Sequence, residues 1–70
     1  MSKIHASMAG NLWKVLVAVG DSVSEGQEVA ILESMKMEIP IGSEKGGRVK
    51  NILKQEGDFV NEGDELIELE

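Results

Sequence analysis

The chain of 70 residues contains no cysteine and no tyrosine, and it has only one histidine, one proline, one tryptophan and one phenylalanine. Without cysteine there is no disulfide, thiolate metal site, iron–sulfur cluster or cysteine nucleophile. The single histidine, His5, cannot supply a multi-histidine zinc site. No serine lies in a Gly-x-Ser-x-Gly motif. These absences predict a protein with no metal site and no catalytic residues, in which His5 is an ordinary surface or strand residue.

Positive charge is also scarce, with 7 Lys and Arg against 13 Asp and Glu and a formal net charge of −6. Nucleic acids bind basic surfaces, so we expect no nucleic acid partner. The longest apolar run, residues 15–19, is far shorter than a membrane span, and residues 1–5 lead into no run of signal-peptide length. We therefore expect a cytoplasmic protein without a membrane partner.

The sequence repeats itself. A shift of 37 positions aligns residues 1–33 with residues 38–70 without a gap, and 11 of the 33 aligned pairs are identical. The best match aligns Gly-Asp-Ser-Val-Ser-Glu-Gly, residues 20–26, with Gly-Asp-Phe-Val-Asn-Glu-Gly, residues 57–63. The chain is thus expected to be one domain, 1–70, made of two equivalent units and a junction at residues 34–37.

Short apolar segments separated by Gly, Asp and Asn predict about four β-strands in each unit. The clearest segments are residues 12–19, 29–32, 49–53 and 66–69. Pro40 lacks an amide hydrogen, so its strand should be an edge strand or begin there. Two equivalent halves predict an all-β sandwich or flattened β-barrel with a pseudo-twofold axis.

Two further groups of residues are assigned structural roles. Trp13 and Phe59 are expected to be buried or half-buried, because large apolar side chains are usually packed against a core. Asp21, Asp58 and Asp64 lie beside glycines but lack the ligand spacing of a calcium loop. We interpret these three aspartates as turn formers, with the glycines supplying positive φ.

The junction Ser-Met-Lys-Met, residues 34–37, is flanked by Glu33 and Glu38. It connects two strands and is therefore expected to be a tight hairpin near the pseudo-twofold axis. Two-residue hairpin turns favour Asn-Gly, Asp-Gly or Gly-x, and Met35-Lys36 does not follow this rule. A local rule broken without structural benefit is typical of a functional site. The alternative is a plain strand with both methionines facing inward and the lysine facing water.

Residues 33–38, Glu-Ser-Met-Lys-Met-Glu, resemble the Met-Lys-Met motif of biotinyl domains, the carriers of biotin-dependent carboxylases. The resemblance extends over nearly the whole chain, and further matching segments are Ser-Met-Ala-Gly at 7–10, the two Gly-Asp-x-Val-x-Glu-Gly segments and Gly-Gly-Arg-Val at 46–49. Such likeness to free-standing biotin/lipoyl attachment proteins implies a flattened β-barrel of two four-stranded sheets.

By the same resemblance, Lys36 is the residue that biotin protein ligase acylates, and Met35 and Met37 contribute to recognition by that ligase. Glu33 and Glu38 flank the attachment hairpin. The chain would then be a carrier rather than an enzyme, moving a carboxyl group on covalent biotin between biotin carboxylase and carboxyltransferase. The lysine must lose a proton inside the ligase, because an alkylammonium is not nucleophilic.

Three departures from the family pattern are evident. Ser34 replaces the commoner alanine, Ser7 stands where a proline is frequent, and the gapless repeat leaves no room for the thumb loop of some carriers. The missing thumb brings the chain closer to lipoyl domains. Lipoate on Lys36, attached by a lipoyl ligase for 2-oxo acid dehydrogenase chemistry, is therefore an alternative to biotin, as is dual modification. An unmodified barrel used for assembly is an alternative of another class.

Overall fold

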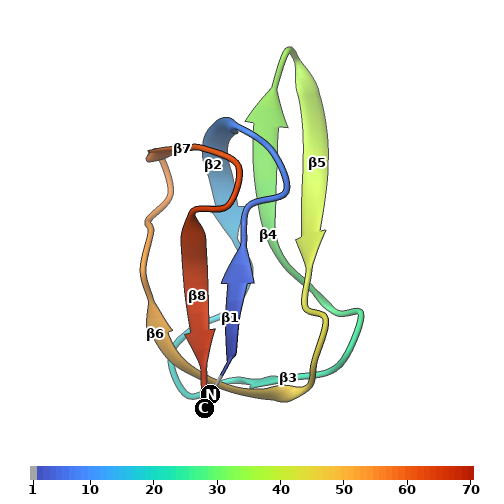
Figure 1. Cartoon of the computed structure of the whole chain (residues 1–70), viewed down its shortest axis with the longest axis vertical. Coiled ribbons are helices and arrows are strands. Elements are labelled where there is room, and N and C mark those ends of the chain that lie inside the picture. The colour runs from blue at the N-terminus through green and yellow to red at the C-terminus, as the bar shows by residue number, and fades with distance from the viewer. Residues whose placement is uncertain (1) are drawn as a thin grey trace.

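The structure is a computed structural model that describes residues 2–70, whose regular elements are eight β-strands. Met1, the first residue of the expected domain 1–70 and of repeat unit 1–33, lies outside the described residues. The strands, in chain order, are β1 (Ser2–His5), β2 (Gly10–Val15), β3 (Ser22–Val23), β4 (Glu28–Ser34), β5 (Met37–Gly42), β6 (Gly47–Ile52), β7 (Phe59–Val60) and β8 (Glu65–Leu69). They form two antiparallel sheets of four strands, ordered β1-β8-β6-β3 and β5-β4-β2-β7 (Figure 1).

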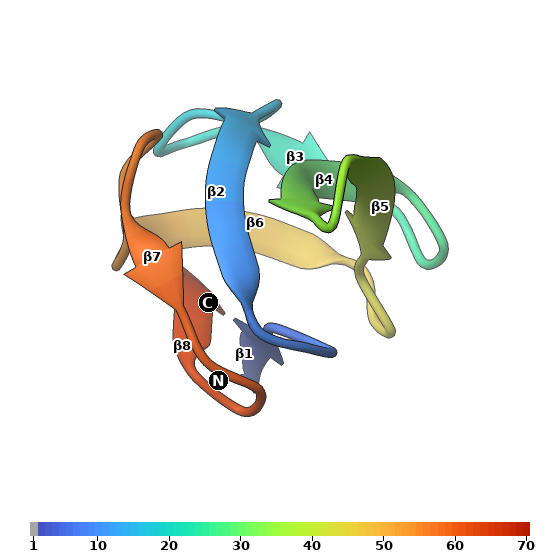
Figure 2. The same ribbon diagram turned by 90° about the horizontal axis from the view of Figure 1, so that it is seen from above.

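The two sheets enclose one aliphatic core. Figure 2 shows β2 of one sheet crossing β6 of the other, and the space between the sheets is filled by side chains from both halves. The buried hydrophobic residues are Ile4, Ala6, Leu12, Val17, Val23, Val29, Ala30, Leu32, Ile41, Val49, Val60, Leu66, Ile67 and Leu69. Most of them come in pairs separated by the repeat offset, so the two sequence units supply equivalent parts of the core. The expected all-β flattened barrel is confirmed.

Strand pairing repeats with the same offset as the sequence. Leu12 lies opposite Leu32 in the β2–β4 pair, and Val49 lies opposite Leu69 in the β6–β8 pair. The β4–β5 and β1–β8 pairs correspond in the same way, including the position of their register shifts. The pseudo-twofold symmetry predicted from the sequence is therefore present in the hydrogen-bond register.

Each half also bonds to the other through its turns. The amide of Gly20 donates to the carbonyl of Val49 at 2.9 Å, and the equivalent amide of Gly57 donates to the carbonyl of Leu12 at 2.8 Å. Gly20 and Gly57 have φ values of 95° and 96°, a region that residues with a Cβ rarely adopt. The repeated Gly-Asp segments thus form the turns expected of them and also bind the two halves together.

The aspartates of these segments stabilise the turns directly. The amide of Ala18 donates to Oδ2 of Asp21, and the amide of Gln55 donates to Oδ2 of Asp58, both at 2.8 Å. Asp64 accepts in the same way from the amide three residues before it, at 2.8 Å. These are local side-chain to backbone bonds of the kind that favour turns over strands. The interpretation of the three aspartates as turn formers is confirmed.

One strand prediction was too long. The apolar run suggested a strand over residues 12–19, but β2 ends at Val15. The amide of Asp21 donates to the carbonyl of Ala18 at 3.0 Å, and the Asp21 carboxylate accepts from the Ala18 amide. This closed turn uses the backbone groups that a longer strand would have needed, and it leaves Leu16 and Val19 exposed.

The prediction that both aromatic residues are buried or half-buried was wrong for Phe59, which is 61% exposed. Trp13 is half-buried, with 42% of its surface exposed, and neither aromatic residue belongs to the core. Successive side chains of a strand point to opposite faces, and the neighbouring Leu12 and Val60 occupy the inward positions. Aliphatic side chains therefore fill the interior, while the Trp13 ring lies under the ammonium of Lys14, 5.5 Å from the ring centroid.

Candidate functional site

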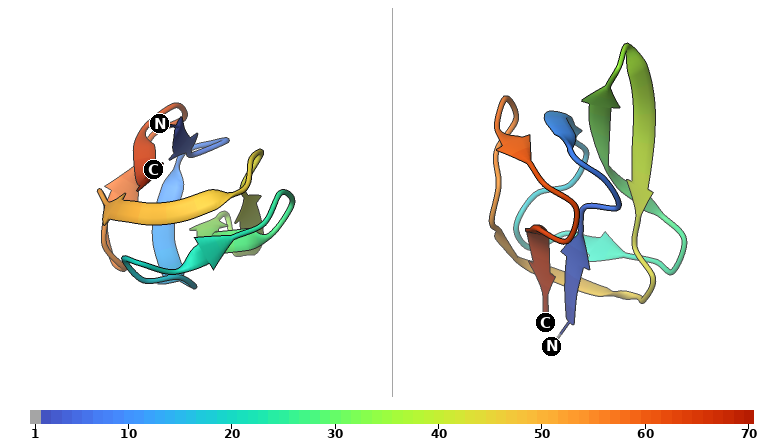
Figure 3. Two further views of the ribbon diagram at one scale, coloured as in Figure 1. Left: turned by 90° about the horizontal axis from the view of Figure 1, so that it is seen from below. Right: turned by 45° about the horizontal axis from the view of Figure 1, so that its top comes forward.

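The β4–β5 hairpin projects from one end of the barrel. β4 has seven residues and is the longest strand, and it pairs with β5 from Glu28–Gly42 at its base to Ser34–Met37 at its tip. The tip stands beyond the other strands, while the chain ends lie at the opposite end of the molecule (Figures 1 and 3). β5 is the edge strand of its sheet, which confirms the edge position expected for Pro40.

The hairpin closes with a strained two-residue turn. Ser34 pairs with Met37, and the central residues Met35 and Lys36 have φ values of 52° and 65°. Positive φ at both central positions is typical of a type I′ turn, which normally contains asparagine, aspartate or glycine. A residue with a Cβ costs about 1–2 kcal/mol in this left-handed region. The expected tight hairpin is present, and its residues are held in a conformation that they do not favour.

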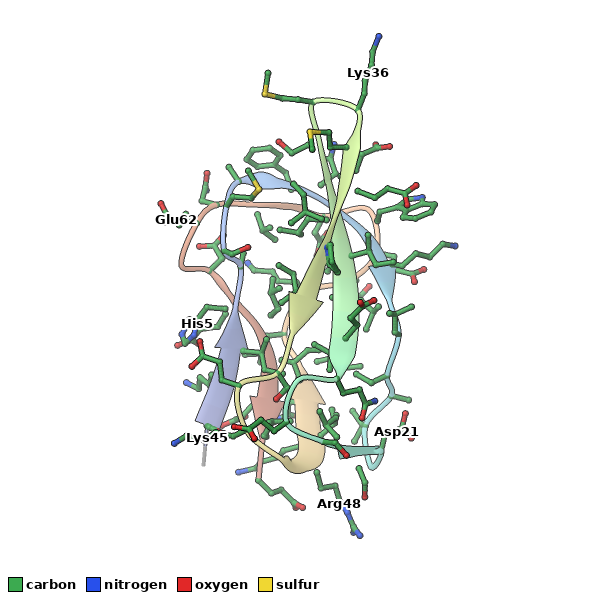
Figure 4. The ribbon with its side chains drawn as sticks, turned by 90° about the vertical axis from the view of Figure 1, so that its right-hand side faces the viewer. His5, Asp21, Lys36, Lys45, Arg48 and Glu62 are labelled. Atoms are coloured by element: carbon green, nitrogen blue, oxygen red, sulfur yellow. The ribbon has the colours of Figure 1, made fainter. Side chains whose placement is uncertain are left out.

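Lys36 is exposed, and its side chain points away from the barrel (Figure 4). Within residues 2–70, no hydrogen bond or ion pair engages its amine. The amine is therefore free to enter the active site of another protein, and the paired strands below it give it a fixed base. This is the geometry required of a lysine that another enzyme modifies.

The two methionines beside Lys36 are both turned to solvent. Met35 is 92% exposed and Met37 is 64% exposed. The alternative of a plain strand with both methionines facing inward is therefore wrong for this segment. Thioether side chains are flexible and polarisable, which suits a surface that adapts to a partner.

A pair of carboxylates lies directly below the turn. Glu33 of β4 is opposite Glu38 of β5, and both are exposed. Like charges that face each other across two strands are destabilising. The left-handed turn is one feature of this hairpin that lowers stability, and the pair of like charges is a second. Such features are typical of functional sites.

The part of the hairpin next to the turn depends on Gly10, a contribution that sequence reasoning missed. A Cβ at Gly10 would lie 2.8 Å from the carbonyl oxygen of Glu33 and 3.3 Å from Cβ of Ser34. β2 can therefore approach β4 this closely only with glycine at this position. The sequence did hold a hint, since Gly10 is one of the identical residues of the repeat and aligns with Gly47.

Other polar residues of the described chain form no comparable site. A hollow of about 290 Å³ lies beside β1 and the β5–β6 connection, and it is lined in part by Lys3, His5 and Lys45. No residue of the hairpin tip lines it. His5 is exposed on β1, as expected. Residues 2–70 contain no group of three or more His, Cys, Asp or Glu side chains arranged to hold a metal ion.

Polar contacts between exposed side chains occur elsewhere, on the β1-β8-β6-β3 sheet. The side-chain amide of Asn51 donates to Oε1 of Glu68 at 3.0 Å and holds the pKa of that carboxyl below its usual value. Lys3 forms an ion pair with Glu65 at 3.4 Å on the same sheet. Both contacts are exposed, and neither involves the β4–β5 hairpin.

Replacing Met35 with asparagine should relieve the strain of the turn. Asparagine tolerates the left-handed region better than methionine does, so Met35→Asn is expected to raise the free energy of unfolding by about 0.5–1 kcal/mol. Urea unfolding followed by circular dichroism measures this change. Met37→Asn is the matched control: Met37 does not have positive φ and lies in β5, where asparagine is unfavourable. A gain in Met37→Asn as large as in Met35→Asn would contradict the role of turn strain.

No helix among the described residues is long and apolar enough to cross a membrane.

Comparison with known proteins gives consistent matches. The family described as biotin-requiring enzyme matches residues 2–69. A biotin/lipoyl attachment protein of Bacillus subtilis is 65% identical over 66 residues, which are 94% of this chain and 90% of that protein. A biotin carboxyl carrier protein of Streptococcus mutans is 52% identical over 62 residues, and the match spans 89% of this chain and 48% of the relative.

A solved structure shows the same fold. The urea carboxylase of Kluyveromyces lactis matches with a TM-score of 0.87 and 39% sequence identity, over 94% of this chain and 6% of that enzyme. The chain thus spans nearly all of one small relative, about half of a carrier protein and a small part of a large carboxylase.

Proposed function

We propose, because the chain belongs to the family of biotin/lipoyl attachment domains, that it carries biotin covalently on Lys36 and moves a carboxyl group between two active sites. The observation that carries this proposal is the free amine of Lys36 at the tip of a projecting, left-handed turn. A carrier needs one accessible attachment residue held away from its own body. No other lysine is at the centre of such a turn in the described chain.

Of the residues of this chain, attachment uses only the Lys36 side chain. Inside the ligase the amine loses a proton and attacks the carbonyl carbon of biotinyl-adenylate; the amide C–N bond forms, the acyl–phosphate C–O bond breaks and AMP leaves. The amide that forms is uncharged. The formal net charge therefore falls from −6 to −7. When bound, biotin supplies a ureido nitrogen that accepts and releases a carboxyl group, and the protein supplies position. The exposed tip of the hairpin fits this group, because nothing in residues 2–70 covers the amine.

We assign recognition by biotin protein ligase to the residues beside the lysine. Met35 and Met37 offer an adaptable apolar surface on both sides of the amine. Glu33 and Glu38 place two negative charges below it, which would orient a partner with basic groups around its active site. The like-charge pair is costly for the isolated hairpin, and a role in recognition accounts for it.

The chain itself is a carrier rather than an enzyme. We propose biotin carboxylase and carboxyltransferase as the proteins that use the loaded hairpin in turn, and the cytoplasm as the place where they meet. The carboxyl carrier and urea carboxylase relatives support this assignment, although their whole activities belong to longer proteins. The strands below the tip hold Lys36 on a fixed base, which suits repeated delivery of one group to two sites.

We also propose that residues 1–70 form one attachment domain, with units 1–33 and 38–70 joined by the hairpin at 34–37. The reciprocal hydrogen bonds of Gly20 and Gly57 support a single cooperative unit, because each half completes the other.

Intact mass of the protein purified from its own host tests the function. We expect an increase equal to one biotinyl group, located at Lys36 by peptide mapping. An increase equal to one lipoyl group would show that the chain is a lipoylated carrier of acyl groups instead. A protein that remains without either group in cells with active ligases would contradict the carrier function and favour an unmodified assembly module.

A further inference from the structure

The methionines of the described chain differ widely in their exposure to solvent. Met8 is 39% exposed, Met37 is 64% exposed and Met35 is 92% exposed. Methionine oxidation follows access of the oxidant to sulfur. The order of exposure therefore predicts that Met35 reacts before Met37 and that Met8 reacts last. The residue expected to react fastest is adjacent to the proposed attachment lysine.

We propose that Met35 is a site of reversible oxidation by hydrogen peroxide, and that its sulfoxide slows attachment of biotin to Lys36. This inference rests on the proposed function, since it concerns control of the same hairpin. In the reaction, a sulfur lone pair attacks one peroxide oxygen and the O–O bond breaks. An S–O bond forms, and the departing hydroxide takes up the released proton and leaves as water. Sulfur loses two electrons, and the peroxide gains two.

The position of Met35 in the turn links oxidation to attachment. Met35 and Lys36 are the two central residues of the turn, and Met37 follows directly. An active site that encloses the Lys36 amine must therefore also cover the neighbouring thioethers. Oxidation turns an apolar side chain into a polar one. Burying the new S–O group without a partner is unfavourable, which is expected to slow attachment about tenfold.

Oxidation at this position leaves the barrel intact. The buried hydrophobic residues of the described chain include no methionine, and Met35 projects into solvent. A buried methionine would disrupt its core on oxidation, whereas Met35 changes only the surface of the hairpin tip. The modification can thus act on recognition without unfolding the protein, and sulfoxide reductases can reach it to restore the thioether.

A competition experiment within one sample tests the proposal. Unmodified full-length protein is treated with hydrogen peroxide until about half of the molecules carry one added oxygen. The mixture is then incubated briefly with biotin protein ligase, ATP and biotin. Biotinylated and unmodified molecules are separated, and peptide mass spectrometry measures the oxygen on Met35 in each fraction. We expect the Met35 sulfoxide to be about tenfold depleted in the biotinylated fraction. Methionine sulfoxide reductases A and B with dithiothreitol should remove this difference.

Variants separate Met35 from the other sulfurs. Met8→Leu should show the same peroxide sensitivity as the parent protein, because Met8 lies outside the hairpin. Met35→Leu, measured against its own untreated rate, should lose most of that sensitivity. Urea unfolding should be nearly the same before and after oxidation of the parent protein.

Several outcomes would overturn the proposal. Equal amounts of Met35 sulfoxide in the two fractions would show that the ligase does not distinguish oxidised from unoxidised protein. If peroxide slows biotin attachment to Met35→Leu as much as to the parent protein, the effect belongs to another residue. If oxidation unfolds the protein, the slower attachment of biotin would result from loss of structure and not from a change in recognition. A parent protein that takes no biotin before peroxide treatment would overturn the proposed function itself, and this inference with it.

Discussion

Replacing Lys36 with arginine is expected to abolish the gain of a biotinyl group completely. Arginine keeps the positive charge and much of the length of lysine, so the electrostatics of the hairpin tip change little. Its guanidinium stays protonated at all ordinary pH values and does not act as a nucleophile toward an activated carboxyl group. The measurement is the intact mass of purified protein after incubation with biotin protein ligase, ATP and biotin.

Lys45→Arg is the matched control for this substitution. Lys45 is also an exposed lysine, but it lies in the connection between β5 and β6 rather than at the hairpin tip. This variant should gain the biotinyl group at the rate of the parent protein. The assignment of Lys36 fails if Lys36→Arg is still labelled, or if the control loses labelling as well. Circular dichroism of both variants should match the parent protein, since neither side chain is buried.

The architecture could be predicted from the sequence because the repeat carries long-range information. Residues 37 positions apart are aligned in the sequence, and the same offset governs the register of the sheets. The turns were equally predictable, since glycine and aspartate act through local hydrogen bonds and positive φ. Local chemistry and internal symmetry were therefore enough for the fold class.

The predictions that failed depended on which face of a strand becomes buried. Trp13 and Phe59 are the largest apolar side chains of the sequence, yet Leu12 and Val60 fill the inward positions. Size favours burial on average, but the pleat of a strand assigns each residue to one face. The end of β2 was also predicted wrongly. Ala18 is part of the apolar run, but its amide bonds to Asp21 in a turn rather than to a neighbouring strand.

At the candidate site, the sequence predicted the hairpin but not its supports. The prediction of a tight turn at Met35-Lys36 came from position in the repeat, and the structure adds that both residues are left-handed. The opposition of Glu33 and Glu38 depends on strand register, which a sequence specifies only through pairing. The close contact of β2 with the hairpin, at Gly10 and Glu33, depends on how near the two backbones lie, and no sequence pattern predicts that distance.

Symmetry explains where the lysine lies. The β4–β5 pair corresponds to the β8–β1 pair under the repeat offset. One of these equivalent pairs is joined by the turn at Met35-Lys36, while the other is open, with the chain ends beside it. Of these two equivalent strand pairs, only β4–β5 is closed by a covalent connection within the described chain, and residues 34–37, which interrupt the repeat, form it. A group attached there lies at the opposite end of the barrel from both ends of that chain (Figure 1).

The same symmetry supplies a sharp test of the support below the hairpin. Gly10 and Gly47 are equivalent in the repeat, and each begins a strand, β2 or β6. A Cβ at Gly10 would lie 2.8 Å from the Glu33 carbonyl oxygen, whereas the closest atom to a Cβ at Gly47 lies at 3.5 Å. The first distance requires the backbones to separate, and the second is an ordinary contact. Neither glycine has positive φ, so alanine is compatible with both backbone conformations.

Gly10→Ala is therefore expected to lower the free energy of unfolding by about 2 kcal/mol, as overpacking does. Gly47→Ala should be neutral or stabilising by up to about 1 kcal/mol, because alanine loses less conformational entropy on folding. Urea unfolding of both variants measures the difference. Since Gly10 packs against Glu33 directly below the turn of the hairpin, Gly10→Ala should also slow biotin attachment, while Gly47→Ala should not. Equal effects of the two substitutions would mean that the close approach of β2 to β4 does not position the hairpin.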